Sequence, residues 1–301
     1  MYDLIIIGSG PAGISAGIYS AIYKLNALII GEKSGGYAAD AYKIINYPGM
    51  SEISGLELMQ KFAKHLQKFN VPTKTEVVNK ISKLKNGFKI ITDKLSYQSK
   101  TVILATGSER RRLHIPGENE LTGKGVAYCA TCDAFFFKDK ITAVIGGADS
   151  ALTSALHLAE TAKKVYLIYR KENPTALPAW IEKVKNNPKI ELIAKTNIKK
   201  IIGENKVEAI ELDKSYQNKN ILPLDGVFIE IGSVPLTNIV GSLGVNIDNE
   251  GFVKVKENQE TNISGFFAAG DVTTGSNKLE QIITASAEGA VAANSVFKNI
   301  K

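Results

Sequence analysis

Cysteine and histidine are scarce in this sequence of 301 residues, which contains two cysteines and three histidines. The histidines, His65, His114 and His157, are scattered singly along the chain. A zinc site needs several thiolate, imidazole or carboxylate ligands brought together, and no such spacing is present. We therefore predict no metal site. Because there is no third cysteine, Cys129 and Cys132 can form a disulfide within the chain only with each other.

Long apolar runs are also absent, because no stretch reaches the roughly 20 residues that a membrane-spanning helix needs. The chain begins Met1-Tyr2-Asp3-Leu4 and enters a strand pattern at once, without the features of a signal peptide. No basic cluster is interleaved with aromatic residues, which argues against nucleic acid as a partner. We predict a cytoplasmic protein that binds neither a membrane nor nucleic acid.

Positive charge is in excess, with a formal net charge of +7 and a pI near 9.1. Such an excess favours acidic partners through long-range attraction. A lysine-rich, solvated surface without any such partner produces the same excess, so the charge alone leaves both interpretations open.

Both cysteines lie in the C-A-T-C-D stretch at residues 129–133. Two thiols at this spacing can close a small ring and reopen it by thiol–disulfide exchange. They could also be two buried cysteines that lie close together by chance. A C-x-x-C motif within an α/β pattern favours redox work, above all in a chain without other cysteines. We predict that Cys129 and Cys132 are the catalytic pair, with the carboxylate of Asp133 directly behind them.

A dinucleotide-binding pattern opens the chain. The apolar residues 3–7 are typical of a buried parallel strand, and they run directly into a G-x-G-x-x-G turn at residues 8–13. A helix pattern follows, and a second apolar run at residues 27–30 ends near Glu32. Strand, glycine turn, helix, strand and acid together make this signal far more specific than the glycines alone.

Each glycine of this turn has its own task. Gly8 permits the tight turn, Gly10 lets the backbone approach a pyrophosphate, and Gly13 lets the helix pack on the strand. The helix N-terminus attracts phosphate. Glu32 can hold the ribose hydroxyls of an adenosine.

A second pattern of the same kind begins in the middle of the chain. Residues 141–145 predict a strand, residues 146–151 a glycine turn, residues 152–161 a helix and residues 165–169 the next strand. The middle glycine of the turn is replaced by Ala148. Its methyl group would push against a pyrophosphate.

The end of that second strand is also unusual for a nucleotide site. A 2′-phosphate needs arginines there, and residues 169–175 read Y-R-K-E-N-P-T, with one arginine and one lysine beside Glu172. NADPH could still bind through altered contacts. We favour the other interpretation, in which this domain keeps its fold without a nicotinamide cofactor, because two separate requirements fail together.

The two patterns predict an α/β protein with two Rossmann-like (three-layer ββα) nucleotide-binding domains, the second inserted into the first. We place the first, discontinuous domain at residues 1–112 and 238–301. The inserted, NAD(P)H-type domain covers residues 113–237 and carries the C-x-x-C motif. The arginine run at residues 110–112 and the turn at Pro235 mark the two junctions.

Over nearly its whole length the chain resembles the low-molecular-weight flavin thioredoxin reductases. The stretches that carry the resemblance are G-S-G-P-A-G at 8–13, N-Y-P-G at 46–49, A-T-G at 105–107, C-A-T-C-D at 129–133, G-G-A-D-S-A at 146–151 and F-A-A-G-D-V at 267–272. This resemblance implies FAD bound by the discontinuous domain, a redox disulfide in the inserted domain, thioredoxin as a partner, and a homodimer.

The resemblance also implies roles for single residues. Cys132 is similar to the thiol that faces the flavin, Cys129 to the thiol that attacks thioredoxin, and Asp133 to the acid that trades a proton. Asp271 is similar to the aspartate that binds the ribityl chain of FAD, and Gln281 to the glutamine near the isoalloxazine. The expected cofactor-binding residues are Gly8, Gly10, Pro11, Ala12, Gly13, Glu32, Lys33, Gly36, Asn46, Ala105, Thr106, Gly107, Gly270, Asp271 and Gln281.

Several positions depart from the family pattern. The usual NADPH phosphate cluster, H-R-R-x-x-x-R, is reduced to the Y-R-K-E-N-P-T of residues 169–175. The other departures are Ala148 for a glycine, Glu280 for an arginine and Tyr37 for a glutamine. Together they resemble family members that take no electrons from NADPH, including the ferredoxin-dependent flavin thioredoxin reductases. Ferredoxins are small acidic proteins, which suits the positive net charge. We therefore expect ferredoxin as the electron donor and regard NADPH as doubtful.

Three other functions stay open. A conventional NADPH-dependent thioredoxin reductase would bind the nicotinamide cofactor despite these departures. An FAD dithiol oxidase would use every one of the same motifs and pass electrons from a dithiol to oxygen or another acceptor. A non-catalytic flavin redox sensor would signal through the disulfide.

Overall fold

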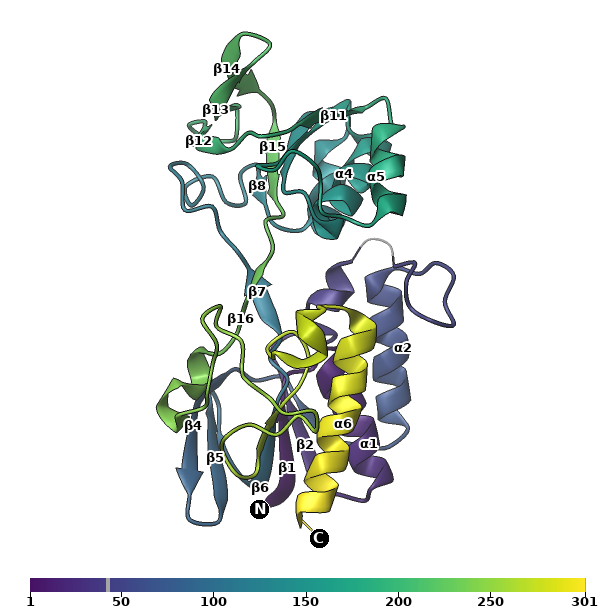
Figure 1. The fold of residues 1–301 in the computed structure, drawn as a ribbon, viewed down its shortest axis with the longest axis vertical. Coiled ribbons are helices and arrows are strands. Elements are labelled where there is room, and N and C mark those ends of the chain that lie inside the picture. The colour runs from purple at the N-terminus through teal and green to yellow at the C-terminus, as the bar shows by residue number, and fades with distance from the viewer. Residues whose placement is uncertain (42–43, 301) are drawn as a thin grey trace. The chain divides into compact units, whose positions relative to one another are not determined.

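The computed structural model describes residues 1–41 and 44–300, with the exception of the side chains of Thr131 and Cys132. The chain forms two compact units, one of Met1–Glu109 with Val234–Lys301 and one of Arg110–Ser233. The junctions expected after residues 112 and 237 thus fall three and four residues beyond the observed ones. At the crossings, strands β7 (Ser108–Arg110) and β16 (Ser233–Pro235) pair with each other (Figure 1).

The first unit contains most of the N-terminal elements and all of the C-terminal ones. Its strands are β1 (Tyr2–Ile7), β2 (Ala27–Ile30), β3 (Thr73–Lys74), β4 (Val78–Leu84), β5 (Gly87–Thr92), β6 (Ser96–Leu104) and β17 (Phe266–Ala268). Its helices are α1 (Pro11–Ile22), α2 (Gly55–Gln67) and α6 (Ile282–Ile300), with 3-10 turns η1 (Gly36–Asp40), η3 (Asn238–Leu243) and η4 (Gly275–Lys278).

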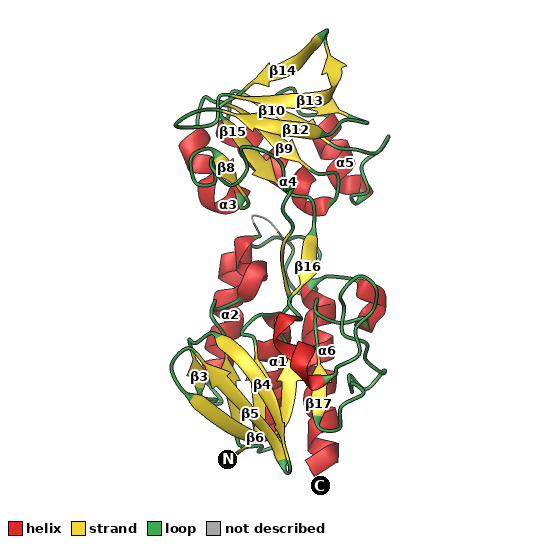
Figure 2. Ribbon diagram, turned by 90° about the vertical axis from the view of Figure 1, so that its left-hand side faces the viewer, coloured by secondary structure: helices red, strands yellow, loops and turns green. Residues whose placement is uncertain are grey.

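A parallel sheet in the order β3-β2-β1-β6-β17 forms the centre of this unit, and the antiparallel strands β5 and β4 extend it from the first half of β6. Alternate residues of β1 serve opposite faces. Leu4 and Ile6 pack with α1 and α6, whereas Ile5 and Ile7 pack with β4 and β5. The helices and the antiparallel strands therefore form separate layers on the two faces of the sheet (Figure 2).

Local features of the sequence determine where α2 begins and how closely α1 and α6 pack. Ser54 caps α2, because its hydroxyl accepts the N–H of Glu57 at 3.2 Å. Helices α1 and α6 approach closely at Gly289, where a methyl group would lie 2.1 Å from the carbonyl oxygen of Ala12. The small residues of the C-terminal helix thus allow it to lie directly on the helix that follows the first glycine turn.

The second unit repeats the same kind of architecture. Its strands are β8 (Val126–Ala127), β9 (Ile141–Ile145), β10 (Lys164–Ile168), β11 (Ile190–Ile193), β12 (Ile198–Ile202), β13 (Ala209–Tyr216), β14 (Lys219–Pro223) and β15 (Gly226–Ile229). Its helices are α3 (Ala130–Asp133), α4 (Asp149–Thr161) and α5 (Pro178–Lys185), with the 3-10 turn η2 (Ala134–Phe137).

Here the parallel sheet has the order β11-β10-β9-β15-β8, and β12, β13 and β14 form an antiparallel sheet. One hydrophobic core joins the two sheets, with Ile145 and Ile168 from the parallel sheet and Ile210 and Leu222 from the antiparallel one. Helices α4 and α5 lie next to the parallel sheet (Figure 2). The prediction of an α/β protein with two Rossmann-like three-layer units is confirmed.

Candidate functional site

The first glycine turn, between β1 and α1, forms an open cradle. Gly8 has a φ of +119°, and a methyl group on it would lie 2.0 Å from the carbonyl oxygen of Ala105. A methyl group on Gly13 would lie 1.9 Å from the carbonyl oxygen of Gly8, so this glycine is needed for packing. A methyl group on Gly10 would meet only ordinary contacts, at 3.9 Å. Neither backbone nor packing requires a glycine there, which fits the close approach of a ligand phosphate.

Helix α1 begins at this turn. Gly10 is the N-cap residue, and Pro11 follows at the first helical position, where its missing N–H does no harm. Ala12 is buried beneath Gly270, since a methyl group on Gly270 would lie 3.0 Å from the Ala12 side chain. The small side chain of Ala12 therefore brings the end of β17 close to the cradle.

The expected cofactor-binding residues that follow β2 differ in whether the protein itself already engages their side chains. Glu32 is exposed directly beyond the strand. Lys33 is engaged by the protein itself, because its ammonium pairs with Asp40 at 2.6 Å and its carbonyl accepts the Ser9 hydroxyl at 2.8 Å. Gly36 has a φ of +57° at the start of η1. The carboxylate of Glu32 is thus in the better position to hold a ribose.

The segment after β6 ends at the same edge of the sheet. The Ala105 N–H donates to the Ile7 carbonyl at 2.7 Å, which aligns this segment with the first glycine turn. The hydroxyl of Thr106 donates to the Leu236 carbonyl at 2.9 Å. Gly107 has a φ of +68°, a backbone conformation that favours glycine. Because β1, β6 and β17 are parallel, their carboxyl ends bring these candidate residues to one edge.

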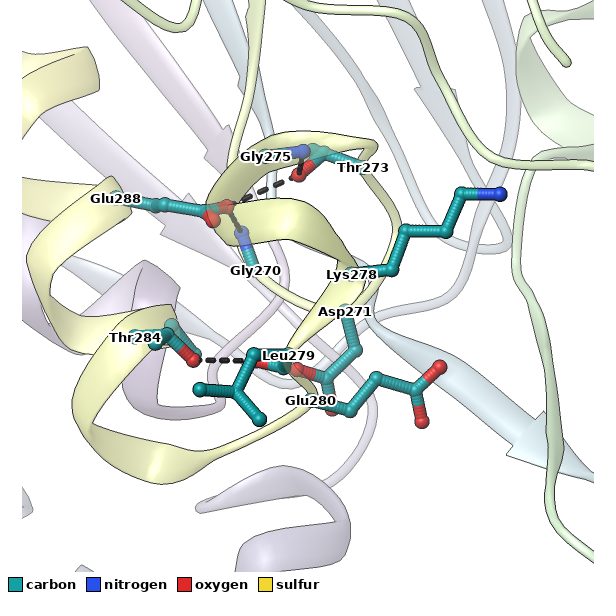
Figure 3. A pocket seen from close by; sticks show the side chains of 10 residues that line it. Gly270, Asp271, Thr273, Gly275, Lys278, Leu279, Glu280, Thr284 and Glu288 are labelled. Carbon is teal, nitrogen blue, oxygen red and sulfur yellow. Dashed lines mark hydrogen bonds between the residues drawn. The ribbon is translucent and has the colours of Figure 1, made fainter. Parts of the chain in front are cut away.

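A pocket lies beyond β17, at the start of the C-terminal segment (Figure 3). Its lining residues are Gly270, Asp271, Thr273, Gly275, Lys278, Leu279, Glu280, Thr284, Ala285 and Glu288. Burial, and then the nearby carboxylates of Glu280 and Glu288, raise the pKa of Asp271 to about 7. A hydroxyl-rich ligand could donate hydrogen bonds to this buried carboxylate.

Glu288 is a site residue that the sequence analysis missed. Its side chain is buried, and one carboxylate oxygen accepts the Gly270 N–H at 2.8 Å and the Thr273 hydroxyl at 3.0 Å (Figure 3). These bonds hold the loop that carries Asp271 against α6. The sequence could have indicated Glu288, because it is a glutamate among the small residues of the C-terminal helix.

Two expected residues from opposite ends of the chain meet. The amide of Asn46 donates to the side-chain oxygen of Gln281 at 2.8 Å. Gln281 directly precedes α6, and the Ala285 N–H donates to its carbonyl at 2.9 Å. The contact joins the N-Y-P-G stretch to the C-terminal helix within the first unit.

The cysteine motif lies in the second unit. Cys129 is disulfide-bonded and half-buried, and it directly precedes the single turn of α3. The Asp133 N–H donates to the Cys129 carbonyl at 3.2 Å, and burial raises the pKa of the Asp133 carboxyl. The side chain of Cys132, the other expected catalytic thiol and the only other cysteine of the sequence, lies outside the described residues.

Three phenylalanines follow the motif, and they have different surroundings. Phe137 packs on Phe228 with ring centroids 5.1 Å apart and fills the space over Gly226. Phe135 and Phe136 are 82% and 73% exposed, although they are large and apolar. Exposed aromatic side chains next to a reactive centre are typical of a protein-docking surface. The sequence analysis missed this pair, which the F-F-F run after the aspartate could have indicated.

The second glycine turn, between β9 and α4, repeats the backbone of the first. Ala148 is the N-cap residue of α4, with φ −98° and ψ −177°, and Gly10 has φ −81° and ψ −170° in the corresponding place. Ala148 is exposed. Its methyl group therefore occupies surface that the first turn leaves open to a phosphate, and the residues present do not fit a pyrophosphate in the same way.

The segment that follows β10 folds back over this turn. The Thr175 N–H donates to the Gly147 carbonyl and the Leu177 N–H donates to the Asp149 carboxylate, both at 2.7 Å. Glu172, which follows the remaining arginine and lysine, pairs with Lys195 at 2.6 Å. The segment thus carries an acidic side chain directly after its one arginine and one lysine.

Within the described residues, no group of three or more histidine, cysteine, aspartate or glutamate side chains has an arrangement that could hold a metal ion. Among those same residues, every helix is too short or too polar to span a membrane.

Comparisons with known proteins place these features in context. Residues 2–289 match the model of the pyridine nucleotide-disulphide oxidoreductase family. The thioredoxin reductase of Peptoclostridium acidaminophilum is 36% identical, over 100% of this chain and 98% of its own. The solved thioredoxin reductase of Lactococcus lactis has a TM-score of 0.95 at 34% identity, covering 100% of this chain and 99% of its own. The ferredoxin-flavin thioredoxin reductase of Clostridium acetobutylicum has a TM-score of 0.54 at 34% identity, covering 99% and 98%.

Proposed function

Because this chain belongs to the pyridine nucleotide-disulphide oxidoreductase family, we propose that it is a flavin-dependent thioredoxin reductase with FAD as its cofactor. The observation that carries the proposal is the disulfide at Cys129, which closes a C-x-x-C motif in one unit while the other unit presents an open glycine cradle. Relatives that span the whole chain carry the same activity in their names.

The first unit fits FAD along one edge of its sheet. The cradle at Gly10 would receive the pyrophosphate, Glu32 the adenosine ribose, and Asp271 the ribityl hydroxyls. The bond between Asn46 and Gln281 would close the site next to the ring system. When bound, FAD would supply the electron pair that reduces the disulfide.

The second unit supplies the thiol chemistry. Reduction breaks the sulfur–sulfur bond and leaves two thiols. The Cys129 thiolate then attacks the disulfide of thioredoxin, forming a mixed disulfide and releasing one thioredoxin thiolate. The Cys132 thiolate attacks that mixed disulfide, which reforms the enzyme disulfide and releases dithiol thioredoxin. Asp133, whose pKa is raised by burial, can give a proton to a departing thiolate.

Phe135 and Phe136 fit this exchange as the docking surface for thioredoxin. Their exposed rings stand at the end of the motif that reacts, so an apolar patch on the partner would be buried as the sulfur atoms meet. We also propose a homodimer, as the resemblance implies, which light scattering on the purified protein would test.

For the electron donor we propose a ferredoxin in place of NADPH. Three features of the second unit support this choice: the methyl group of Ala148 at the phosphate position, the segment that folds over the turn, and the acidic Glu172. The net charge of +7 favours association with a small acidic protein. A solved relative of 34% identity is named a ferredoxin-flavin thioredoxin reductase.

Anaerobic mixing of the oxidised protein with each donor tests this choice. We expect reduced ferredoxin to bleach the visible flavin band and to support thioredoxin reduction, at a rate that falls as ionic strength rises. We expect micromolar NADPH to leave the band unchanged. The variant Ala148→Gly, combined with Glu172→Arg, should gain measurable reduction by NADPH. Rapid bleaching of the wild type by micromolar NADPH would reject the donor proposal and leave the thioredoxin reductase proposal standing.

The reductase activity itself has a separate test. Purified protein should be yellow, or become yellow when FAD is added back, and should reduce the disulfide of a thioredoxin with either chemical or enzymatic flavin reduction. A protein that binds no flavin, or one that consumes oxygen with a dithiol while leaving every thioredoxin oxidised, would contradict it.

A further inference from the structure

A buried carboxylate is hydrogen-bonded to the residue that precedes the redox motif. Glu118 is only 1% exposed. One oxygen, Oε1, accepts the Tyr128 hydroxyl at 2.7 Å and the Leu113 N–H at 3.0 Å, and the other, Oε2, accepts the His114 N–H at 2.6 Å. Three donors therefore satisfy this buried charge, as burial requires. The carboxylate ties the segment that follows β7 to the residue that precedes Cys129.

Tyr128 is held from several sides. Burial and then the Glu118 carboxylate raise the pKa of its hydroxyl to about 12, so the hydroxyl stays protonated and donates. The Arg112 guanidinium lies 5.4 Å from the centre of the ring and donates to the Asn119 side chain at 2.9 Å. The ring thus has a cation on its face and an anion at its hydroxyl, and few rotamers satisfy both.

The backbone on either side of Tyr128 is also fixed. Ala127 pairs with Phe228 in the parallel sheet, and Ala130 is buried at the start of α3. Cys129 lies between them. The side chain of Tyr128 is therefore the anchor at the junction between a strand and the short turn that carries the reactive sulfur.

We propose that Glu118 and Tyr128 are positioning residues for Cys129, and that their hydrogen bond favours closure of the redox disulfide. Closing the ring requires that Cys129 hold one place and one direction. An anchored neighbour reduces the conformational freedom that the dithiol form would otherwise have, so the closed form becomes more favourable. Loss of the anchor should weaken the disulfide relative to the dithiol and make the pair a stronger oxidant.

The chain contains a matched control in its other unit. Tyr97 donates to the buried Glu76 at 2.9 Å, Glu76 also accepts the Thr92 hydroxyl at 2.7 Å, and the pKa of Tyr97 is likewise raised to about 12. Tyr97→Phe and Tyr128→Phe therefore remove the same kind of bond from the same kind of site. Only the bond from Tyr128 to Glu118 adjoins a cysteine.

The test measures the equilibrium between dithiol and disulfide in glutathione redox buffers, on the full-length flavoprotein, by trapping free thiols and counting them by mass spectrometry. We expect Tyr128→Phe to lower the equilibrium constant for ring closure by up to about fivefold, the largest factor that one net hydrogen bond of about 1 kcal/mol supplies. Glu118→Gln should also lower it, because the amide has one acceptor oxygen and cannot accept from both the Tyr128 and the His114 donors. Tyr97→Phe should leave it unchanged.

Equal constants for Tyr128→Phe and the wild type would overturn the proposal, and so would an equal fall in Tyr97→Phe. If Glu118→Gln does not fold, the comparison of the two tyrosine variants still decides. The inference rests on the proposed function only in taking Cys129 as an exchanging thiol. The measurement uses neither an electron donor nor thioredoxin, so its outcome is separate from that of the turnover assays.

Discussion

Replacement of Asp271 by asparagine should make the flavin-free protein more stable at pH 8. In the folded chain, burial and the carboxylates of Glu280 and Glu288 raise the pKa of Asp271 from 3.8 to about 7. At pH 8 this residue is charged in surroundings that disfavour the charge. Asparagine has nearly the same shape and no charge, so the variant keeps the packing and removes the unfavourable charge.

The magnitude follows from linkage. A carboxyl group whose pKa is higher in the folded than in the unfolded state binds more protons when folded, so its charge lowers the free energy of unfolding as pH rises between the two values. Each pH unit in that window corresponds to about 1.4 kcal/mol. As pH rises from the unfolded pKa of 3.8 to the folded pKa of about 7, the free energy of unfolding of the wild type should therefore fall by about 4 kcal/mol. That of Asp271→Asn should not fall in this way.

Urea unfolding of the two flavin-free proteins at pH 5 and pH 8 measures this difference. The variant should be more stable by about 4 kcal/mol at pH 8 and by about 1.5 kcal/mol at pH 5. Asp248→Asn is a control of opposite sign, because Lys278 lies 2.7 Å from Asp248 and lowers its pKa. A carboxyl group whose pKa is lower in the folded than in the unfolded state stabilises the fold at pH values above both pKa values. Asp248→Asn should therefore lose stability at pH 8. An advantage of Asp271→Asn that is absent, or equal at both pH values, would refute the reasoning.

Three further predictions concern the cofactor and the disulfide. Cys129→Ser should lower thioredoxin turnover by at least ~10³-fold and leave the flavin bound, as steady-state assays and the visible spectrum would show. Gly10→Ala should leave the free energy of unfolding within about 0.5 kcal/mol of the wild type and should weaken FAD binding. Gly13→Ala should destabilise the fold, because its methyl group would overlap a carbonyl oxygen. Equal unfolding curves for the two variants would contradict this prediction. Joint replacement of Phe135 and Phe136 by alanine should raise KM for thioredoxin and leave reduction of a small aromatic disulfide unchanged.

Much of the fold could be predicted because its signals are local. The apolar run at residues 3–7 and the glycines of residues 8–13 predict a buried strand and a tight turn, and β1 and α1 lie there. The cap that Ser54 places on α2 is a local feature of the same kind, because its bond joins residues only three positions apart. Repetition of the pattern at residues 141–161 was enough to predict the second unit.

The contacts within the candidate site could be predicted less completely, because they join residues that are distant in the chain. The bond from Asn46 to Gln281 spans 235 positions, and no local pattern indicates it. Glu288 reads in sequence as one acid on a small-residue helix, and only the fold places it under the Gly270 loop. Lys33 was expected to bind the cofactor, although its ammonium is paired with Asp40 in the folded chain.

The sequence by itself determined which residues could form a disulfide, because two cysteines leave one pairing, and where the backbone must turn, because those turns need glycine. The tertiary structure decided which side chains are buried, paired or open to a ligand. Gly10 and Ala148 have nearly the same backbone, and the structure adds that Ala148 is exposed, so its methyl group lies on surface that the first turn leaves open. Burial and distance depend on the whole chain packing at once, so no short stretch of sequence contains them.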